Sequence, residues 1–147
     1  MEIDFSLYPI YKKEGIMFFW KEIIEEGLRA IEKYADVDYS VILNSLLEGT
    51  LDLWIIFLNK ECIGFMTTRF NYPTSQIKEL FIYHLYIRQI SNSDEVFKLG
   101  MEKLEEYAKS SGCYRMSFLT SRENGFSKKL KLYNWIPKYV EFIKEVK

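Results

Sequence analysis

The chain has 147 residues, 20 basic and 21 acidic side chains, and an apolar fraction of 48%. This length fits one folded domain over residues 1–147, and the composition is too apolar for a disordered chain. The net charge of −1 offers no basic field to nucleic acid or to an anionic membrane, so neither partner is expected. The sequence shows no signal-peptide pattern and no apolar run of about 18 residues, and we expect a cytoplasmic protein.

The first half of the chain predicts a strand followed by two helices. Residues 2–9 alternate polar and apolar side chains and end at a proline, which predicts a strand. Over 15–31, apolar residues recur every three or four positions, which is typical of an amphipathic helix. A second helix is predicted over 38–49, with Asp38 or Ser40 as its N-cap and a glycine at its end.

Three strands are predicted in the middle of the chain. Residues 51–59 and 62–70 are rich in β-branched and aromatic side chains and flank a short polar turn, which predicts a β-hairpin. A loop is predicted over 71–76. Residues 78–87 form a nearly unbroken apolar run, as expected of a strand that is covered on both faces.

The last third predicts a long helix over 94–110, a strand over 113–121, a short basic helix over 125–134 and a terminal strand over 138–146. The order strand–helix–strand implies a right-handed parallel crossover within an otherwise antiparallel sheet. The predicted fold is therefore mixed α/β (α+β), with helices on both faces of the sheet. The residues expected to face inward from the long helix are Val96, Leu99, Gly100, Leu104 and Tyr107.

Three segments carry a resemblance to a known family. They are "LWIIFLNKECIGFMTTRF" (53–70), "ELFIYHLYI" (79–87) and "LGMEKLEEYAKSSGCYRMSFLTSREN" (99–124). In their order and spacing they resemble strands two to five and the third helix of the GNAT superfamily of acetyl-CoA-dependent N-acetyltransferases. The resemblance implies a GNAT-like fold over almost the whole chain.

The resemblance also implies where acetyl-CoA would bind. In that family the fourth and fifth strands splay apart, and the pantetheine arm pairs with the fourth strand. The pyrophosphate lies on the turn before the third helix, where backbone N–H groups and the helix dipole favour anions. By position, the cofactor-binding residues are Leu85, Tyr86, Ile87, Arg88, Asn92, Ser93, Glu95, Val96, Phe97 and Asn124.

The turn before this helix departs from the family pattern, Arg/Gln-x-x-Gly-x-Gly/Ala. Asn92, Glu95 and Phe97 stand at the basic position and the two glycine positions. Phe97 is bulky where a phosphate needs close approach, and Glu95 adds negative charge beside Asp94. Each such charge at roughly 5 Å from a phosphate costs about 3 kcal/mol at an effective dielectric constant near 20.

The same acids suit an ordinary helix start. Acidic residues in the first turn stabilise a helix, and Ser91 or Ser93 can serve as the N-cap. We therefore interpret the turn as a capped helix start that holds no phosphate. The alternative is a loop that shifts and binds coenzyme A through Arg88 or a neighbouring lysine.

Three residues are candidates for acid–base chemistry. The family's general acid is a tyrosine, and Tyr133 lies two residues beyond the position that the family spacing indicates. Glu79 and His84 are candidates for the base. Their alternatives are an exposed strand-end charge for Glu79 and a hydrogen-bonded core residue for His84. With one histidine and no C-x-x-C pair, we expect no metal site.

Two functions follow from these observations. The first is a GNAT-fold protein with lost or weakened acetyl-CoA chemistry and no bound cofactor, acting as a protein-binding or structural module. Such chains resemble GNAT-like proteins of phage genomes, including virion proteins, and imply a protein partner or self-association. The alternative is an acetyl-CoA-dependent N-acyltransferase acting on a primary amine of a small molecule or a protein.

The basic segment 128–138 is interpreted as a solvated helix face.

Overall fold

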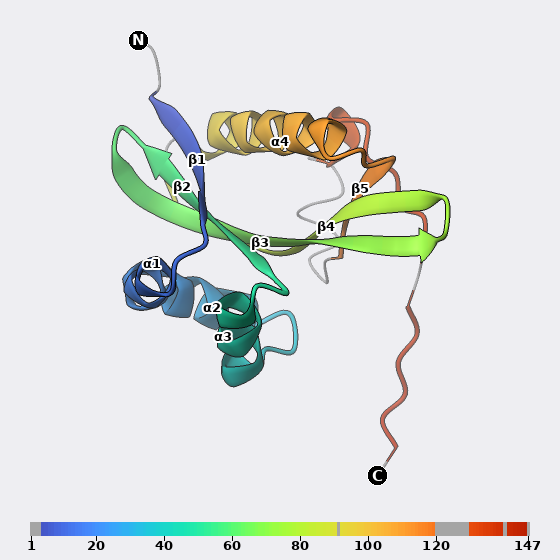
Figure 1. Ribbon diagram of the computed structural model, residues 1–147, viewed down its shortest axis with the longest axis horizontal. Helices are drawn as coiled ribbons and strands as arrows, with labels where there is room; N and C mark the ends of the chain where they lie inside the picture. Colours follow the sequence, from blue (N-terminus) through green and yellow to red (C-terminus); the bar gives the residue numbers. More distant parts are fainter. Residues whose placement is uncertain (1–3, 91, 120–129, 140, 147) are drawn as a thin grey trace.

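The computed structural model describes residues 4–90, 92–119, 130–139 and 141–146, and its strands form one five-stranded sheet (Figure 1). The strand order is β1-β2-β3-β4-β5. The strands are β1 (Phe5–Ile10), β2 (Asp52–Leu58), β3 (Glu61–Thr74), β4 (Ile77–Ile87) and β5 (Arg115–Phe118). β1 to β4 are antiparallel neighbours, and β5 lies parallel to β4. The predicted mixed α/β fold with one parallel crossover is confirmed.

Helices cover both faces of the sheet (Figure 1). The helix α4 (Ser93–Ser110) crosses from β4 to β5 on one face. On the other face lie α1 (Lys13–Phe19), η1 (Trp20–Ile24), α2 (Glu25–Ile31) and α3 (Tyr39–Glu48). The first three follow one another directly, and η1 is a π-helical segment between two α-helical ones. No helix in the described part of the chain is both long and apolar enough to cross a membrane.

The sheet separates two apolar clusters. Between the sheet and α4, the buried side chains include Trp54, Ile56, Met66, Leu80, Ile82 and Leu104. Between the sheet and the other helices, they include Ile23, Ile24, Leu28, Leu53, Ile55 and Phe65. Alternate residues of β2 thus contribute to opposite clusters, which is why its sequence is an unbroken apolar run.

Local sequence signals explain several element boundaries. The Asp38 carboxylate accepts a hydrogen bond from the Val41 N–H at 3.2 Å and caps α3. Gly49 ends that helix in the left-handed conformation, with φ of 80°. Asn59 and Lys60 both have positive φ, and this two-residue turn joins β2 to β3.

Two predicted segments differ from the structure. β3 extends to Thr74, which pairs with Ile77, so part of the predicted loop 71–76 is strand. Backbone hydrogen bonding across a hairpin does not require apolar side chains, so the polar composition of 71–76 gave no sign of this strand pairing. The predicted terminal strand is also wrong for 138–139 and 141–146, which form no strand. Although side chains alternate in this segment, its backbone has no neighbouring strand to pair with among the described residues.

The predicted helix over 125–134 is described only in its last part. Residues 130–132 form one helical turn, and 125–129 lie outside the described residues. Asn134 follows with φ of 67°. The N–H groups of Asn134 and Trp135 bond to the carbonyls of Lys131 and Leu130, which is the pattern of a Schellman C-cap.

Candidate active site

β4 and β5 diverge after a short paired stretch. β4 pairs with β5 from Glu79 to Ile82, while on its other side it pairs with β3 as far as Ile87. In the described part of the chain, residues 83–87 therefore have no strand partner on the β5 side. An unpaired backbone edge of this kind can take up an extended chain by hydrogen bonding. Leu85, Tyr86 and Ile87, predicted to contact pantetheine, lie on this edge.

A β-bulge shapes the same part of β4. Thr67 of β3 lies opposite His84, and Thr68 lies opposite Ile82, which leaves Tyr83 as an extra residue. The extra residue reverses the alternation of side chains along β4. As a result, Tyr83 and His84 both lie on the face opposite α4, with ring centroids 4.9 Å apart. The side chains that pack toward α4 are Leu80, Ile82, Leu85 and Ile87.

His84 is a buried, neutral imidazole. Its side chain is 7% exposed, and Nδ1 lies 2.6 Å from Oγ1 of the fully buried Thr67. Burial lowers the pKa of His84 to about 4, since a charged ring would lose its hydration. The ring is therefore uncharged at neutral pH.

Glu79 lies inside the sheet, and the expectation of an exposed strand-end charge is wrong. It is 7% exposed and lies directly opposite Arg115 in the register of β4 and β5. Arg115 Nε donates to one carboxylate oxygen at 2.7 Å, and Ser117 Oγ donates to the other at 3.0 Å. The hydrogen bond to Glu79 raises the pKa of Arg115. Glu79 thus joins the start of β5 to β4.

The start of α4 differs from the predicted cap. Asn92 is the N-cap residue, and its side chain makes no cap hydrogen bond. Ser93 is already helical, so its predicted role as N-cap is wrong, and Ser91 lies outside the described residues. Asp94 and Glu95 are exposed in the first turn, whereas Val96 is buried.

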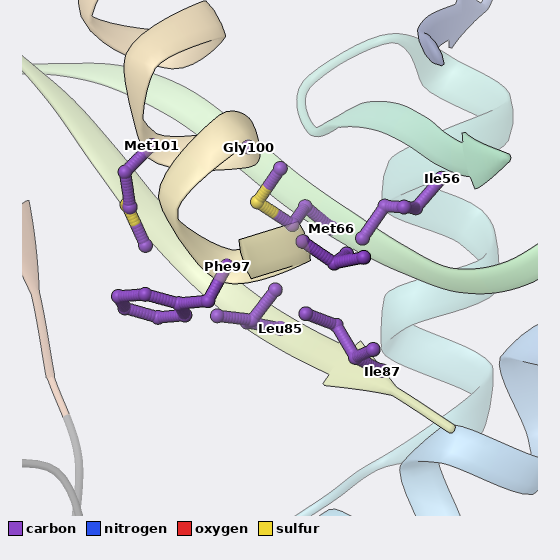
Figure 2. Close-up of a pocket in the computed structure, with 8 residues that line it drawn as sticks. Ile56, Met66, Leu85, Ile87, Phe97, Gly100 and Met101 are labelled. Atoms are coloured by element: carbon purple, nitrogen blue, oxygen red, sulfur yellow. The ribbon is translucent and has the colours of Figure 1, made fainter. Parts of the chain in front are cut away.

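Phe97 turns into the core. It is 4% exposed and packs under α4 beside Leu85, as Figure 2 shows. The apolar cavity between these residues has a volume of about 10 Å³, which leaves room for no ligand. The Phe97 ring lies 5.9 Å from the ring of Tyr133, measured between centroids. Tyr133 therefore lies on the α4 side of the sheet, next to Phe97.

Arg88 belongs to a different cluster. Its guanidinium binds the Glu26 carboxylate through two bonds, from Nε at 2.9 Å and from Nη2 at 3.0 Å. The Tyr86 hydroxyl donates to the same carboxylate at 2.7 Å. Burial, together with this bond, raises the pKa of Tyr86 to about 12. Both side chains thus connect the end of β4 to α2, and the sequence pattern did not indicate Glu26 as their partner.

The predicted site residues therefore form three groups. Leu85, Ile87, Phe97 and Tyr133 lie on the α4 side. Glu79 lies in the part of β4 that pairs with β5, and His84 lies on the face of β4 opposite α4. Arg88 is bound to Glu26. Asn124 lies outside the described residues.

A family model described as "Acetyltransferase (GNAT) family" matches residues 17–134, which is most of the chain. The chain belongs to this family. The resemblance to GNAT proteins drawn from the sequence is thereby confirmed, and the splayed pair β4 and β5 agrees with it. A search of curated proteins gave no match.

Solved structures share the GNAT fold at low sequence identity. An aminoglycoside acetyltransferase from an uncultured soil metagenomic sample, in complex with sisomicin, superposes with a TM-score of 0.69 at 11% identity, over 97% of each chain. A predicted acetyltransferase with acetyl-CoA from Clostridium acetobutylicum gives 0.67 at 16% identity, over 97% of this chain and 96% of that one. The ribosomal-protein-alanine N-acetyltransferase of Brucella melitensis gives 0.68 at 12% identity, over 99% and 100%. These TM-scores show a common fold.

Proposed function

We propose that this GNAT protein is an acetyl-CoA-dependent N-acyltransferase that acts on a primary amine of a small molecule. The observation that carries the proposal is the backbone edge of β4 beyond Ile82, which has no partner on the β5 side among the described residues. The first function expected from the sequence, a phage-borne binding or virion module, has no support from the comparisons. A protein partner, self-association and cytoplasmic location remain predictions.

The residues around this edge fit acetyl-CoA, which supplies the activated acetyl group. Leu85, Tyr86 and Ile87 offer backbone groups to the pantetheine arm. The 18-residue helix α4 begins beside the end of β4 and directs its positive dipole end toward a pyrophosphate. Because the Phe97 side chain is directed into the core, it does not cover this turn.

The acidic residues at the turn weaken phosphate binding less than the sequence suggested. Asp94 and Glu95 are exposed, so water screens their charges. For two charges about 5 Å apart, the repulsion falls from about 3 kcal/mol at a dielectric constant of 20 to about 0.8 kcal/mol in bulk water. The turn is therefore compatible with a weakly bound cofactor.

We assign the general acid to Tyr133. Its ring packs against Phe97, next to the residues of the open β4 edge, and its phenol can protonate the departing sulfur. Neither His84 nor Glu79 is proposed as the base. The low pKa of His84 makes it a weak proton acceptor, and the Glu79 carboxylate is bonded on both oxygens. The amine thus enters the site in its neutral form, after losing its proton to water.

Calorimetric titration with acetyl-CoA, followed by acetyl-transfer assays on a panel of primary amines, tests the proposal. We expect binding and transfer to at least one amine. Tyr133→Phe should lower kcat by about 10²- to 10⁴-fold and leave acetyl-CoA affinity unchanged. Tyr114→Phe is the control, because that side chain is 78% exposed. If wild-type protein neither binds acetyl-CoA nor forms product, the proposal is wrong.

A further inference from the structure

His84 and Thr67 form an isolated polar pair within the sheet. They lie directly opposite each other on β4 and β3, on the face covered by the N-terminal helices. Thr67 is 0% exposed, and the distance of 2.6 Å between its Oγ1 and Nδ1 of His84 marks a short hydrogen bond. The direction of this bond decides which ring nitrogen carries the proton.

Two arrangements of the protons are conceivable. In the first, Nδ1–H of His84 donates to Thr67, and the Thr67 hydroxyl proton then needs a second acceptor. The described residues provide none for this fully buried side chain, and a buried donor without an acceptor is destabilising. In the second, Thr67 donates to an unprotonated Nδ1, and both side chains are satisfied at this contact.

The other ring nitrogen of His84 has no protein hydrogen-bond partner among the described residues. Within the described part of the chain, no buried side-chain nitrogen or oxygen lacks a hydrogen-bond partner. Thr67 occupies Nδ1 of His84, so Nε2, which has no protein partner among the described residues, keeps slight contact with solvent although the residue is only 7% exposed. The neighbouring ring of Tyr83, 4.9 Å away between centroids, is 44% exposed.

We propose that Thr67 donates its hydroxyl proton to His84 Nδ1 and thereby holds the ring as the Nε2–H tautomer. Thr67 is then a positioning residue. His84 presents an N–H group, and it binds an oxygen atom of the amine substrate. The substrate class is an amine that carries a hydroxyl or carbonyl oxygen near the reacting nitrogen. The tautomer follows from the pair itself, whereas the substrate part rests on the proposed function.

The tautomer can be measured directly, because the chain has one histidine. Long-range ¹H–¹⁵N correlation spectra of the full chain at pH 7 should place the ring proton on Nε2 in the wild type. Thr67→Ser keeps the hydroxyl and should give the same tautomer, whereas Thr67→Val should give a mixture of both. A proton on Nδ1 in the wild type would overturn the inference.

The substrate part is tested with 2-aminoethanol and propan-1-amine, which differ in one hydroxyl group. We expect the wild type and Thr67→Ser to prefer 2-aminoethanol in kcat/KM by about tenfold. In Thr67→Val and His84→Phe the preference should fall toward one, because the loss in kcat/KM falls mainly on 2-aminoethanol. A merely structural role would slow both amines alike, and that result overturns the substrate part.

The two proposals fail in different ways. If neither amine nor any other in the panel is acetylated, the proposed function fails and the substrate part falls with it. The spectra still decide the tautomer, because they need no substrate.

Discussion

At the scale of single residues, Phe97 and Glu95 illustrate how a motif position differs from a side-chain direction. Both stand where the family's turn carries small residues, and both were expected to obstruct a phosphate. In the structure Phe97 is buried under α4, while Glu95, two residues earlier, is exposed. The first is therefore a residue of the core, and the second affects the site through its charge.

Phe97→Ala should lower the free energy of unfolding by about 3–5 kcal/mol, because it leaves a cavity next to one that is already present. Urea denaturation followed by circular dichroism measures the change. Phe142→Ala is the matched control, since that ring is 91% exposed. Equal effects of the two substitutions would contradict the burial of Phe97.

Glu95→Gln should tighten acetyl-CoA binding by about fourfold, which corresponds to the roughly 0.8 kcal/mol of repulsion from one exposed charge. The gain should shrink as salt is added, because ions screen exposed charges. Calorimetric titration at two salt concentrations measures both. Glu102→Gln, exposed further along α4, is the control. An unchanged affinity at low salt would mean that the pyrophosphate does not lie at this turn.

Counting along the chain indicates candidate positions for the site, but it does not indicate the partners of those residues. Tyr133 lies two residues beyond the position that the family spacing indicates, and its ring lies near Phe97. Glu79, in contrast, is bonded to Arg115 across a strand pair, and Arg88 to a helix more than 60 residues earlier. Such contacts depend on register and packing, for which a single sequence carries no local signal.

At the scale of elements, the ion pair between Glu26 and Arg88 connects α2 to the end of β4. The hydrogen bond from Arg88 lowers the pKa of the Glu26 carboxyl below its ordinary value of 4.5. A carboxylate with a lowered pKa stabilises the fold above its unfolded pKa, and this contribution is lost as pH falls through the folded pKa. The pair is thus fully effective at neutral pH.

Glu26→Gln should therefore reduce stability by about 0.5–1 kcal/mol at pH 7, a value that allows for the screening of partly exposed side chains. The difference from the wild type should disappear as the pH falls below 4.5. Chemical denaturation at several pH values measures it, with the exposed Glu61→Gln as control. A difference that is constant with pH would show that the ionised carboxylate is not responsible.

Elements with local signals were predictable, and those that depend on distant neighbours were not. The Asp38 cap and the polar turn between the predicted strands 51–59 and 62–70 were confirmed, because each reflects the chemistry of one or two residues. The bulge at Tyr83 was missed, since the sequence of β4 reads as an uninterrupted apolar strand. The predicted terminal strand is wrong for 138–139 and 141–146, because alternation specifies a strand only where a partner exists.

At the scale of the whole molecule, the GNAT fold persists where sequence identity is low. Solved structures at 11–16% identity superpose over nearly the entire chain. Because a fold can host different chemistries, the fold leaves open which amine is the substrate. The choice of amine must therefore depend on the side chains around the β4 edge, such as His84 and Tyr133.

The divergence of β4 and β5 also predicts how protection against amide hydrogen exchange varies across the sheet. β3 lies between two strands, whereas β5 is a short edge strand that pairs only over Arg115–Phe118. Amides of β5 should therefore exchange with deuterium before those of β3. Mass spectrometry would detect this order, and uniform exchange would contradict it. Added acetyl-CoA should slow exchange at residues 83–87, so that the cofactor completes the sheet which the protein leaves open.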